Sequence, residues 1–190
     1  MHPAIVKGSM IKNFTHTWHY SLANSGNSFS LYFNERLVAI IIKPASGKWP
    51  VHVNINEKMY VFTKRGWLPH TIEIKDAITG EAAGMIHMPF FSSLRGITSF
   101  VFPGGESFTW YSNNFFSFHW KWKKGTDTII DAIDNLSGKK NNGVIVINEY
   151  KSGSDLLIAA GFFLSLLRRS RFTFGIRGLR RRIQFTKTRD

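Results

Sequence analysis

The residues with the strongest chemical character in this sequence are the arginines near its end. Residues 168–190 hold nine Lys and Arg residues against the single acidic residue Asp190, which gives this segment +8 of the chain's formal net charge of +13. Guanidinium groups match the geometry of phosphates and carboxylates and stay charged at physiological pH. Such a segment indicates an anionic partner, either phospholipid, nucleic acid or an acidic protein, or else a solvated tail that keeps the chain in solution.

Bulky apolar residues, among them Phe172, Phe174 and Ile176, are interleaved with these arginines. Mixed basic and apolar residues are typical of segments that lie on an anionic membrane, where each Lys or Arg contributes about 1 kcal/mol. The arginines at 168–171 have an alternative use, because cations also stabilise the C-terminal end of a helix. A second basic group surrounds residue 122, with Lys139 and Lys140 further along. The candidate anion- or lipid-binding residues are Arg168, Arg169, Arg171, Arg177, Arg180, Arg181, Arg182, Lys121, Lys123 and Lys124.

The sequence contains no motif typical of an enzyme active site. A glycine-rich phosphate loop, a Gly-x-Ser-x-Gly elbow and a His-Glu-x-x-His motif are all absent. Asp127, Asp131 and Asp134 could bind a cation or act as acid and base. A calcium loop needs more oxygen ligands and a turn glycine, so we interpret these aspartates as a solvated edge. We expect a non-enzymatic protein without a cofactor.

Histidine and cysteine give no support for a metal site. His16 and His19 have a His-x-x-His spacing, but no acidic or thiolate partner lies close in the sequence. The chain has no cysteine, which excludes disulfides, thiolate ligands and cysteine nucleophiles, and favours a reducing, intracellular location. Four further histidines fall on separate predicted strands, and only the fold could bring them together: His52, His70, His87 and His119.

Residues 155–167 form an almost wholly apolar segment, interrupted only by Asp155, Gly161 and Ser165. A helix that is apolar all round must be buried on every side or inserted in lipid. At about 1.5 Å per residue it would be roughly 20 Å long, whereas a bilayer core needs about 20 apolar residues. No transmembrane span is therefore expected. Ser154 is the predicted N-cap of this helix.

Before this helix, turn residues divide the chain into short segments with the alternation of β-strands. Residues 51–55 alternate apolar and polar side chains, which predicts a half-buried strand. Leu37–Ile42 is a continuous apolar run, which predicts a strand buried on both faces. Four aromatic residues share one face of the strand predicted over residues 115–123, and they need a large interior to fill. They are Phe116, Phe118, Trp120 and Trp122.

Residues 126–136 are compatible with two structures. Asp127, Asp131 and Asp134 fall on one helical face, so the periodicity alone predicts a short helix. The neighbouring turns favour a strand instead. Counting this segment, ten to twelve short strands precede the helix, which predicts a mostly β antiparallel barrel or sandwich. Because a wide barrel has a lumen, we expect the apolar helix to fill it.

Two stretches carry a resemblance to a known family. They are the hairpin at 72–81, Ile-Glu-Ile-Lys-Asp-Ala-Ile-Thr-Gly-Glu, and the strand at 144–150 followed by the apolar residues 155–161. With the order of elements, they resemble the tubby C-terminal-like superfamily, which includes tubby-like proteins, phospholipid scramblases and LURP-one-related proteins. The resemblance implies a barrel of about twelve antiparallel strands around one hydrophobic C-terminal helix (about 155–167), and it favours a strand at 126–136.

The chain departs from that family in three ways. It continues past the helix with 23 residues of basic sequence, and it lacks both the Cys-rich and the proline-rich stretches of scramblases. The phosphoinositide-binding residues of tubby proteins do not align residue by residue, so none is carried over. We divide the chain into an N-terminal segment (1–27), a barrel with its central helix (28–167) and a basic C-terminal tail (168–190).

Together these features predict a non-enzymatic barrel that binds anionic phospholipid or phosphoinositide at a membrane surface. Since the first residues lack the apolar core of a secretory signal, we expect a cytoplasmic protein, peripheral at the inner face of a membrane. One alternative is nucleic-acid binding, with tail aromatics stacking on bases. Another is a structural or protein-interaction domain whose tail adds strands to its own barrel. A fourth hypothesis is a membrane anchor, in which residues 156–167 enter lipid.

Overall fold

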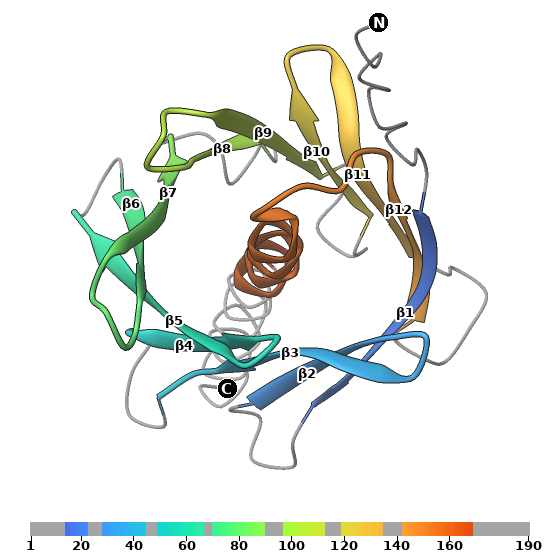
Figure 1. Cartoon of the computed structure of the whole chain (residues 1–190), viewed down its shortest axis with the longest axis horizontal. Coiled ribbons are helices and arrows are strands. Elements are labelled where there is room, and N and C mark those ends of the chain that lie inside the picture. The colour runs from blue at the N-terminus through green and yellow to red at the C-terminus, as the bar shows by residue number, and fades with distance from the viewer. Residues whose placement is uncertain are drawn as a thin grey trace, which may run out of the picture.

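The computed structural model describes residues 14–22, 28–44, 49–66, 70–89, 97–112, 119–134 and 142–168 of the 190-residue chain. These residues form a closed antiparallel barrel of twelve strands around one helix, residues 154–168 (Figure 1). The predicted mostly β fold, a barrel of about twelve strands enclosing one hydrophobic C-terminal helix, is confirmed. The strands are β1 (Phe14–Leu22), β2 (Ser28–Phe33), β3 (Arg36–Ile42), β4 (Val51–Ile55), β5 (Lys58–Arg65), β6 (His70–Asp76), β7 (Ala82–Met88), β8 (Ile97–Val101), β9 (Ser107–Ser112), β10 (Trp120–Lys124), β11 (Asp127–Asp134) and β12 (Asn142–Ile147).

The barrel closes by pairing its first strand with its last. Each strand pairs with the next along the chain, and β1 pairs with β12 in a register that sets Phe14 opposite Ile147 and Trp18 opposite Gly143. A closed barrel has no unpaired strand edge. Among the described strands there is therefore no edge at which a tail could add strands, as one of the alternatives above supposed.

The two ends of the barrel are defined by where the helix enters and leaves. The helix-entry end carries the turns β2–β3, β4–β5, β6–β7, β8–β9 and β10–β11, and residues 148–153, which lead from β12 into the helix. Because consecutive strands are antiparallel, all other strand ends lie at the opposite, helix-exit end. The last described residue, Arg168, donates a hydrogen bond there to the carbonyl oxygen of Ser112 at the end of β9 (3.1 Å).

The width of the barrel accounts for the helix inside it. Twelve strands about 4.8 Å apart and tilted by about 40° make a backbone ring about 24 Å across. A helix with its side chains takes about 10–12 Å of that width, so about 6 Å remains on each side for inward side chains. Aromatic rings fill this space, including Trp120 and Trp122, which are fully buried as predicted. Phe116 and Phe118 lie outside the described residues.

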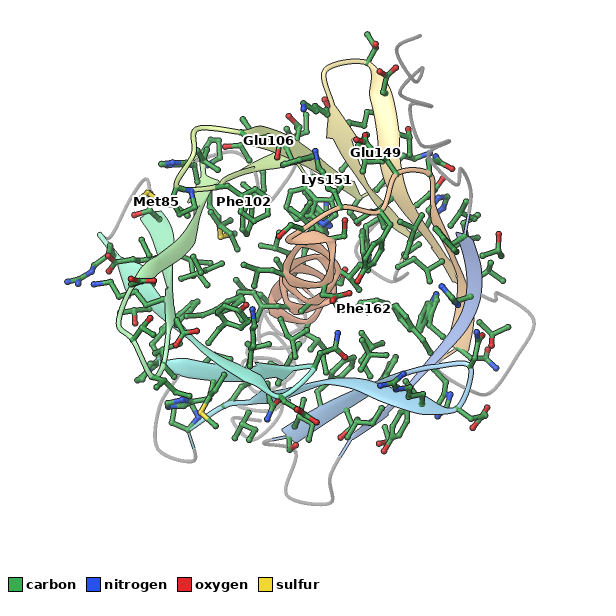
Figure 2. The ribbon with its side chains drawn as sticks, in the orientation of Figure 1. Met85, Phe102, Glu106, Glu149, Lys151 and Phe162 are labelled. Carbon is green, nitrogen blue, oxygen red and sulfur yellow. The ribbon has the colours of Figure 1, made fainter. Side chains whose placement is uncertain are left out.

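One face of the helix packs against the aromatic side of the wall. The ring of Phe162, labelled in Figure 2, lies on the helix inside the barrel. It packs between Trp18 and Trp120, with ring centroids 5.0 and 5.2 Å away and both pairs edge to face. Gly161 faces Trp120 so closely that a Cβ atom would lie 2.6 Å from its ring. A glycine at this position therefore sets the distance between helix and wall.

Two polar side chains inside the barrel donate hydrogen bonds to the backbone of the helix. The indole nitrogen of Trp122 donates to the carbonyl oxygen of Leu157 (2.7 Å), and the Ser165 hydroxyl donates to the carbonyl oxygen of Gly161 (3.0 Å). Ser154 is not the N-cap that the sequence predicted but the first helical residue. Its hydroxyl accepts a hydrogen bond from the N–H of Lys151 (3.0 Å), because the chain turns sharply just before the helix.

Two expectations about strands were wrong. The barrel begins at β1 and not at residue 28, because β1 uses Phe14, His16, Trp18 and Tyr20 on its inward side, where a histidine obscures the apolar alternation. The other error concerns β3, which is buried on one face only. Its outer side is open to solvent, with Leu37 and Ile42 each 45% exposed.

The ambiguous segment at 126–136 is a strand. β11 pairs with β10 on one side and with β12 on the other, so two ladders of backbone hydrogen bonds outweigh its helical periodicity. Ile130 and Ala132 point inward and are fully buried, while Asp131 lies between them on the outer side.

Candidate functional site

The lumen is occupied by the helix, so among the described residues the accessible side chains lie at the ends of the barrel or on its outer face. Every helical residue from 156 to 165 is buried. In the described part of the chain, no helix is long and apolar enough to cross a membrane. The segment that the membrane-anchor hypothesis placed in lipid, residues 156–167, packs inside the barrel instead.

Histidines do not converge on a metal site within the described residues. No three His, Asp or Glu side chains there are close enough to hold an ion. His16 stacks on Phe33 with ring centroids 5.9 Å apart, whereas His19 stacks on Tyr32 at 4.6 Å. Because these two histidines are three residues apart on one strand, they face opposite sides of the sheet and cannot share a ligand.

The three candidate lysines of β10 lie together, but two of them have acidic partners. The ammonium of Lys121 lies 3.4 Å from the carboxylate of Asp131, which His119 also approaches at 3.4 Å. Lys124 lies 2.6 Å from Glu106. Lys123 lies over the ring of Tyr111, 5.4 Å from its centroid. Two of the three β10 lysines are therefore paired with carboxylates of the barrel, while Lys139 and Lys140 lie outside the described residues.

Glu106 joins three parts of the helix-entry end. Its carboxylate accepts hydrogen bonds from Lys124 at the end of β10 and from Lys151 in the segment before the helix (2.6 and 2.5 Å). Figure 2 shows Glu106 and Lys151 side by side above the start of the helix. The Lys124 hydrogen bond, followed by that of Lys151, lowers the pKa of Glu106, and Glu106 in turn raises the pKa of Lys124.

A second group at the same end holds the first turn of the helix. The carboxylate of Asp155 accepts hydrogen bonds from the side-chain amide of Asn56 and from the hydroxyl of Tyr150, both at 2.9 Å. Partial burial, and then the hydrogen bond to Asp155, raise the pKa of Tyr150 to about 12. These contacts tie residues 148–155 to the β4–β5 turn, so we interpret the group as structural.

Of the predicted arginines, the structure places only Arg168. Its guanidinium is partly buried and donates to the Ser112 carbonyl oxygen, and that burial lowers its pKa. Arg168 therefore anchors the end of the helix to β9, a contact that the sequence did not predict. The other candidates, Arg169, Arg171, Arg177, Arg180, Arg181 and Arg182, lie outside the described residues.

Two lysines at the helix-exit end, Lys43 and Lys64, were not among the predicted site residues. Both are partly buried, and burial lowers the pKa of Lys43. Each lysine lies two residues after a buried, inward-facing residue and so on the same side of the sheet: Lys43 follows Ile41, and Lys64 follows Phe62. Extending the two-residue alternation beyond the last apolar residue would have found them.

A groove of about 450 Å³ runs along β3 and β4. Its charged side chains, Arg36 and Glu57, have opposite signs, and the amides of Asn54 and Asn56 add no net charge. Asn56 is already engaged with Asp155. The groove therefore shows no chemistry that selects a ligand.

Charge is distributed unevenly between the two ends. The described residues hold eleven Lys and Arg and eleven Asp and Glu, so this part of the chain has no net formal charge although the whole chain carries +13. The helix-entry end has eight acidic residues against four basic ones. They are Glu35, Glu57, Asp76, Glu81, Glu106, Asp127, Glu149 and Asp155, with Arg36, Lys58, Lys124 and Lys151. Among the described residues at the helix-exit end, four are basic, Lys43, Lys64, Arg65 and Arg168, and one is acidic, Asp134. Glu73 in the middle of β6 pairs with Arg65 at 3.1 Å.

Comparisons of this chain with protein-family models, with curated proteins and with solved structures found no match. The barrel agrees with the architecture that a resemblance to the tubby C-terminal-like superfamily implies. A twelve-stranded barrel with a central helix does not by itself identify that family, which stays a prediction.

Proposed function

We propose that this protein is a non-enzymatic barrel that binds anionic phospholipid, including phosphoinositide, at a membrane surface through its basic C-terminal residues. The observation that carries the proposal is the charge balance. Since the described barrel and helix are neutral, the +13 of the chain belongs entirely to residues outside them, and residues 169–190 hold eight Lys and Arg against Asp190. The barrel serves as a rigid support, and the basic residues make the contact.

Lipid fits these residues better than an acidic protein or nucleic acid. Arg180, Arg181 and Arg182 are flanked by Leu179 and Ile183, so charge and bulky apolar surface alternate over a short distance. That mixture suits the boundary between headgroups and acyl chains, where cations contact phosphate and apolar side chains enter the layer below. We place the protein peripherally, at the inner face of a membrane.

Vesicle co-sedimentation tests the proposal. The full chain should bind vesicles of phosphatidylcholine with phosphatidylserine and not vesicles of phosphatidylcholine alone. The triple variant Arg180→Gln, Arg181→Gln, Arg182→Gln should lower the partition coefficient about a hundredfold, because each cation near such a surface contributes about 1 kcal/mol.

The matched control removes three cations from the barrel itself: Arg36→Gln, Lys58→Gln and Lys75→Gln. It changes the net charge equally and should reduce binding far less. Equal losses in both variants would reduce the effect to bulk charge and contradict the proposal. Salt-dependent gel shifts that show tight binding to RNA or DNA, with no binding to anionic vesicles, would favour nucleic acid instead.

A further inference from the structure

The helix-exit end of the barrel combines cations with partly exposed apolar side chains. Lys43, Lys64 and Arg168 lie at this end and are partly buried. At the same end Leu166 and Trp49 are also partly buried and pack against the core, and the Trp49 ring meets Phe163 edge to face with centroids 5.8 Å apart. A tryptophan next to lysines and arginines is the composition that proteins present to the interfacial region of a bilayer.

The helix-entry end has the opposite character. Its turns carry twice as many acidic as basic residues, and Glu106 already engages two of the cations there, Lys124 and Lys151. An anionic membrane would repel the helix-entry end and attract the helix-exit end, so the charges of the described residues favour one orientation of the barrel relative to the membrane. The helix axis lies along that direction, since the helix runs from the acidic end to the basic end.

We propose that the helix-exit end is the face of the barrel that rests on the anionic bilayer, with Lys43, Lys64 and Arg65 directed at lipid phosphates and the acidic helix-entry end directed away. This orientation rests on the proposed function and goes beyond it, because it assigns part of the contact to the barrel.

Partial burial of the cations supports the assignment. Among the described residues, no carboxylate oxygen lies within 4 Å of the Lys43 ammonium. Removing a cation from water without an anionic partner is unfavourable, and a lipid phosphate at this position would offset that cost. Arg65 is more exposed and lies 3.1 Å from Glu73. We therefore expect it to contribute to lipid binding only at the edge of the helix-exit face.

Single-cysteine labelling tests the orientation directly, because the chain has no cysteine of its own. Ile97→Cys, at the first residue of β8, places a label at the helix-exit end, and Ile78→Cys places one in the β6–β7 turn at the helix-entry end. Both side chains are exposed, by 39% and 85%. With an environment-sensitive fluorophore and vesicles containing nitroxide-labelled lipid, the label at 97 should be quenched on binding and the label at 78 should not.

Two variants on one strand test the contribution of charge. Lys64→Gln at the exit end of β5 should lower the partition coefficient for vesicles containing phosphatidylserine about fivefold, as expected for one lost cation at the surface. Lys58→Gln at the entry end of the same strand removes the same charge and should lower it less than twofold. Thermal melts show whether each variant is folded.

The outcomes separate this orientation from the proposed function. If the wild-type chain binds no anionic vesicle, both are wrong. If it binds and depends on Arg180, Arg181 and Arg182, but the label at 78 is quenched as strongly as the label at 97, or the two lysine variants behave alike, then only the orientation is wrong.

Discussion

At the scale of single residues, the fit between helix and wall depends on a missing side chain. Gly161 lies where the buried ring of Trp120 leaves no space for a Cβ atom, and Trp120 is itself held edge to face against Phe162. A fully buried indole cannot move aside without displacing its neighbours in a densely packed core. The position of the helix along the lumen is therefore set by this contact.

Replacing Gly161 with alanine should destabilise the protein. Overpacking costs about 1–3 kcal/mol, and the better helix propensity of alanine returns at most about 1 kcal/mol. We expect a net loss of about 1–2 kcal/mol, or roughly 3–6 °C in Tm, measured by thermal unfolding.

Gly104→Ala is the matched control, because nothing lies within 4 Å of the position that its Cβ would take. That variant should stay within about 0.5 kcal/mol of the wild type. If Gly161→Ala were equally harmless, helix and wall would not be in the contact described here.

At the scale of elements, the strands show where the sequence was informative and where it was not. The alternation of β4 is visible directly, since Val51, Val53 and Ile55 are buried and His52 is exposed. The apolar outer residues of β3 could not be distinguished from core residues, because hydrophobicity alone does not say which face meets solvent. In β11 the deciding information was the pairing with two neighbouring strands, which the residues of the segment do not contain.

The candidate site was predictable to a smaller extent. The basic end is evident from composition, and Arg168 lies at the C-terminal end of the helix, where the sequence placed it. The partners of Lys121 and Lys124 were not, because Asp131 and Glu106 come from other strands that only the barrel brings alongside.

The contact of Glu106 with Lys124 and Lys151 should make the stability of the barrel depend on pH. The pKa of the Glu106 carboxyl is lowered from its ordinary value of 4.5 by these two hydrogen bonds. A carboxyl whose pKa is lower in the folded state contributes stability that is present above its unfolded pKa and is lost as the pH falls through the folded one. Glu106→Gln should therefore lower Tm at neutral pH, by no more than about 3 °C because the pair is partly exposed.

Melting curves of both proteins between pH 7 and pH 3 provide the measurement. The difference in Tm between wild type and Glu106→Gln should be constant near neutrality and shrink below about pH 4.5. Glu81→Gln, in the exposed β6–β7 turn, serves as the control for loss of one negative charge. A difference that persisted unchanged at pH 3 would show that the carboxylate contributes nothing through its ionised form.

At the scale of the whole molecule, the packed core and the excess positive charge belong to different parts of the chain. The described barrel is neutral, and the excess of positive charge belongs to residues outside it. Which turns share an end follows from the number and direction of the strands, so the acidic and basic ends became visible only once the barrel was known to be closed.

Salt should consequently affect binding and folding to different extents. Raising the ionic strength from about 0.1 M to 1 M shortens the Debye length from about 10 Å to about 3 Å and should abolish sedimentation with phosphatidylserine vesicles. Tm should change little, because packing inside the barrel, and not the exposed ion pairs, holds it together. Vesicle binding that survives 1 M salt would indicate a contact made by apolar insertion and not by charge.

The closure of the barrel through β1 and β12 has a consequence for synthesis. The two strands that seal the wall are separated by residues 23–141, well over half of the chain, and the helix that fills the lumen comes after both. While the ribosome is still adding the last strands, the strands already synthesised expose their inward-facing apolar side chains, because neither the closed barrel nor the helix is there to cover them. Pairing over such a sequence distance also slows folding, so the nascent chain exposes an aggregation-prone apolar surface until its final elements emerge, and its yield in cells should depend on chaperones at that stage.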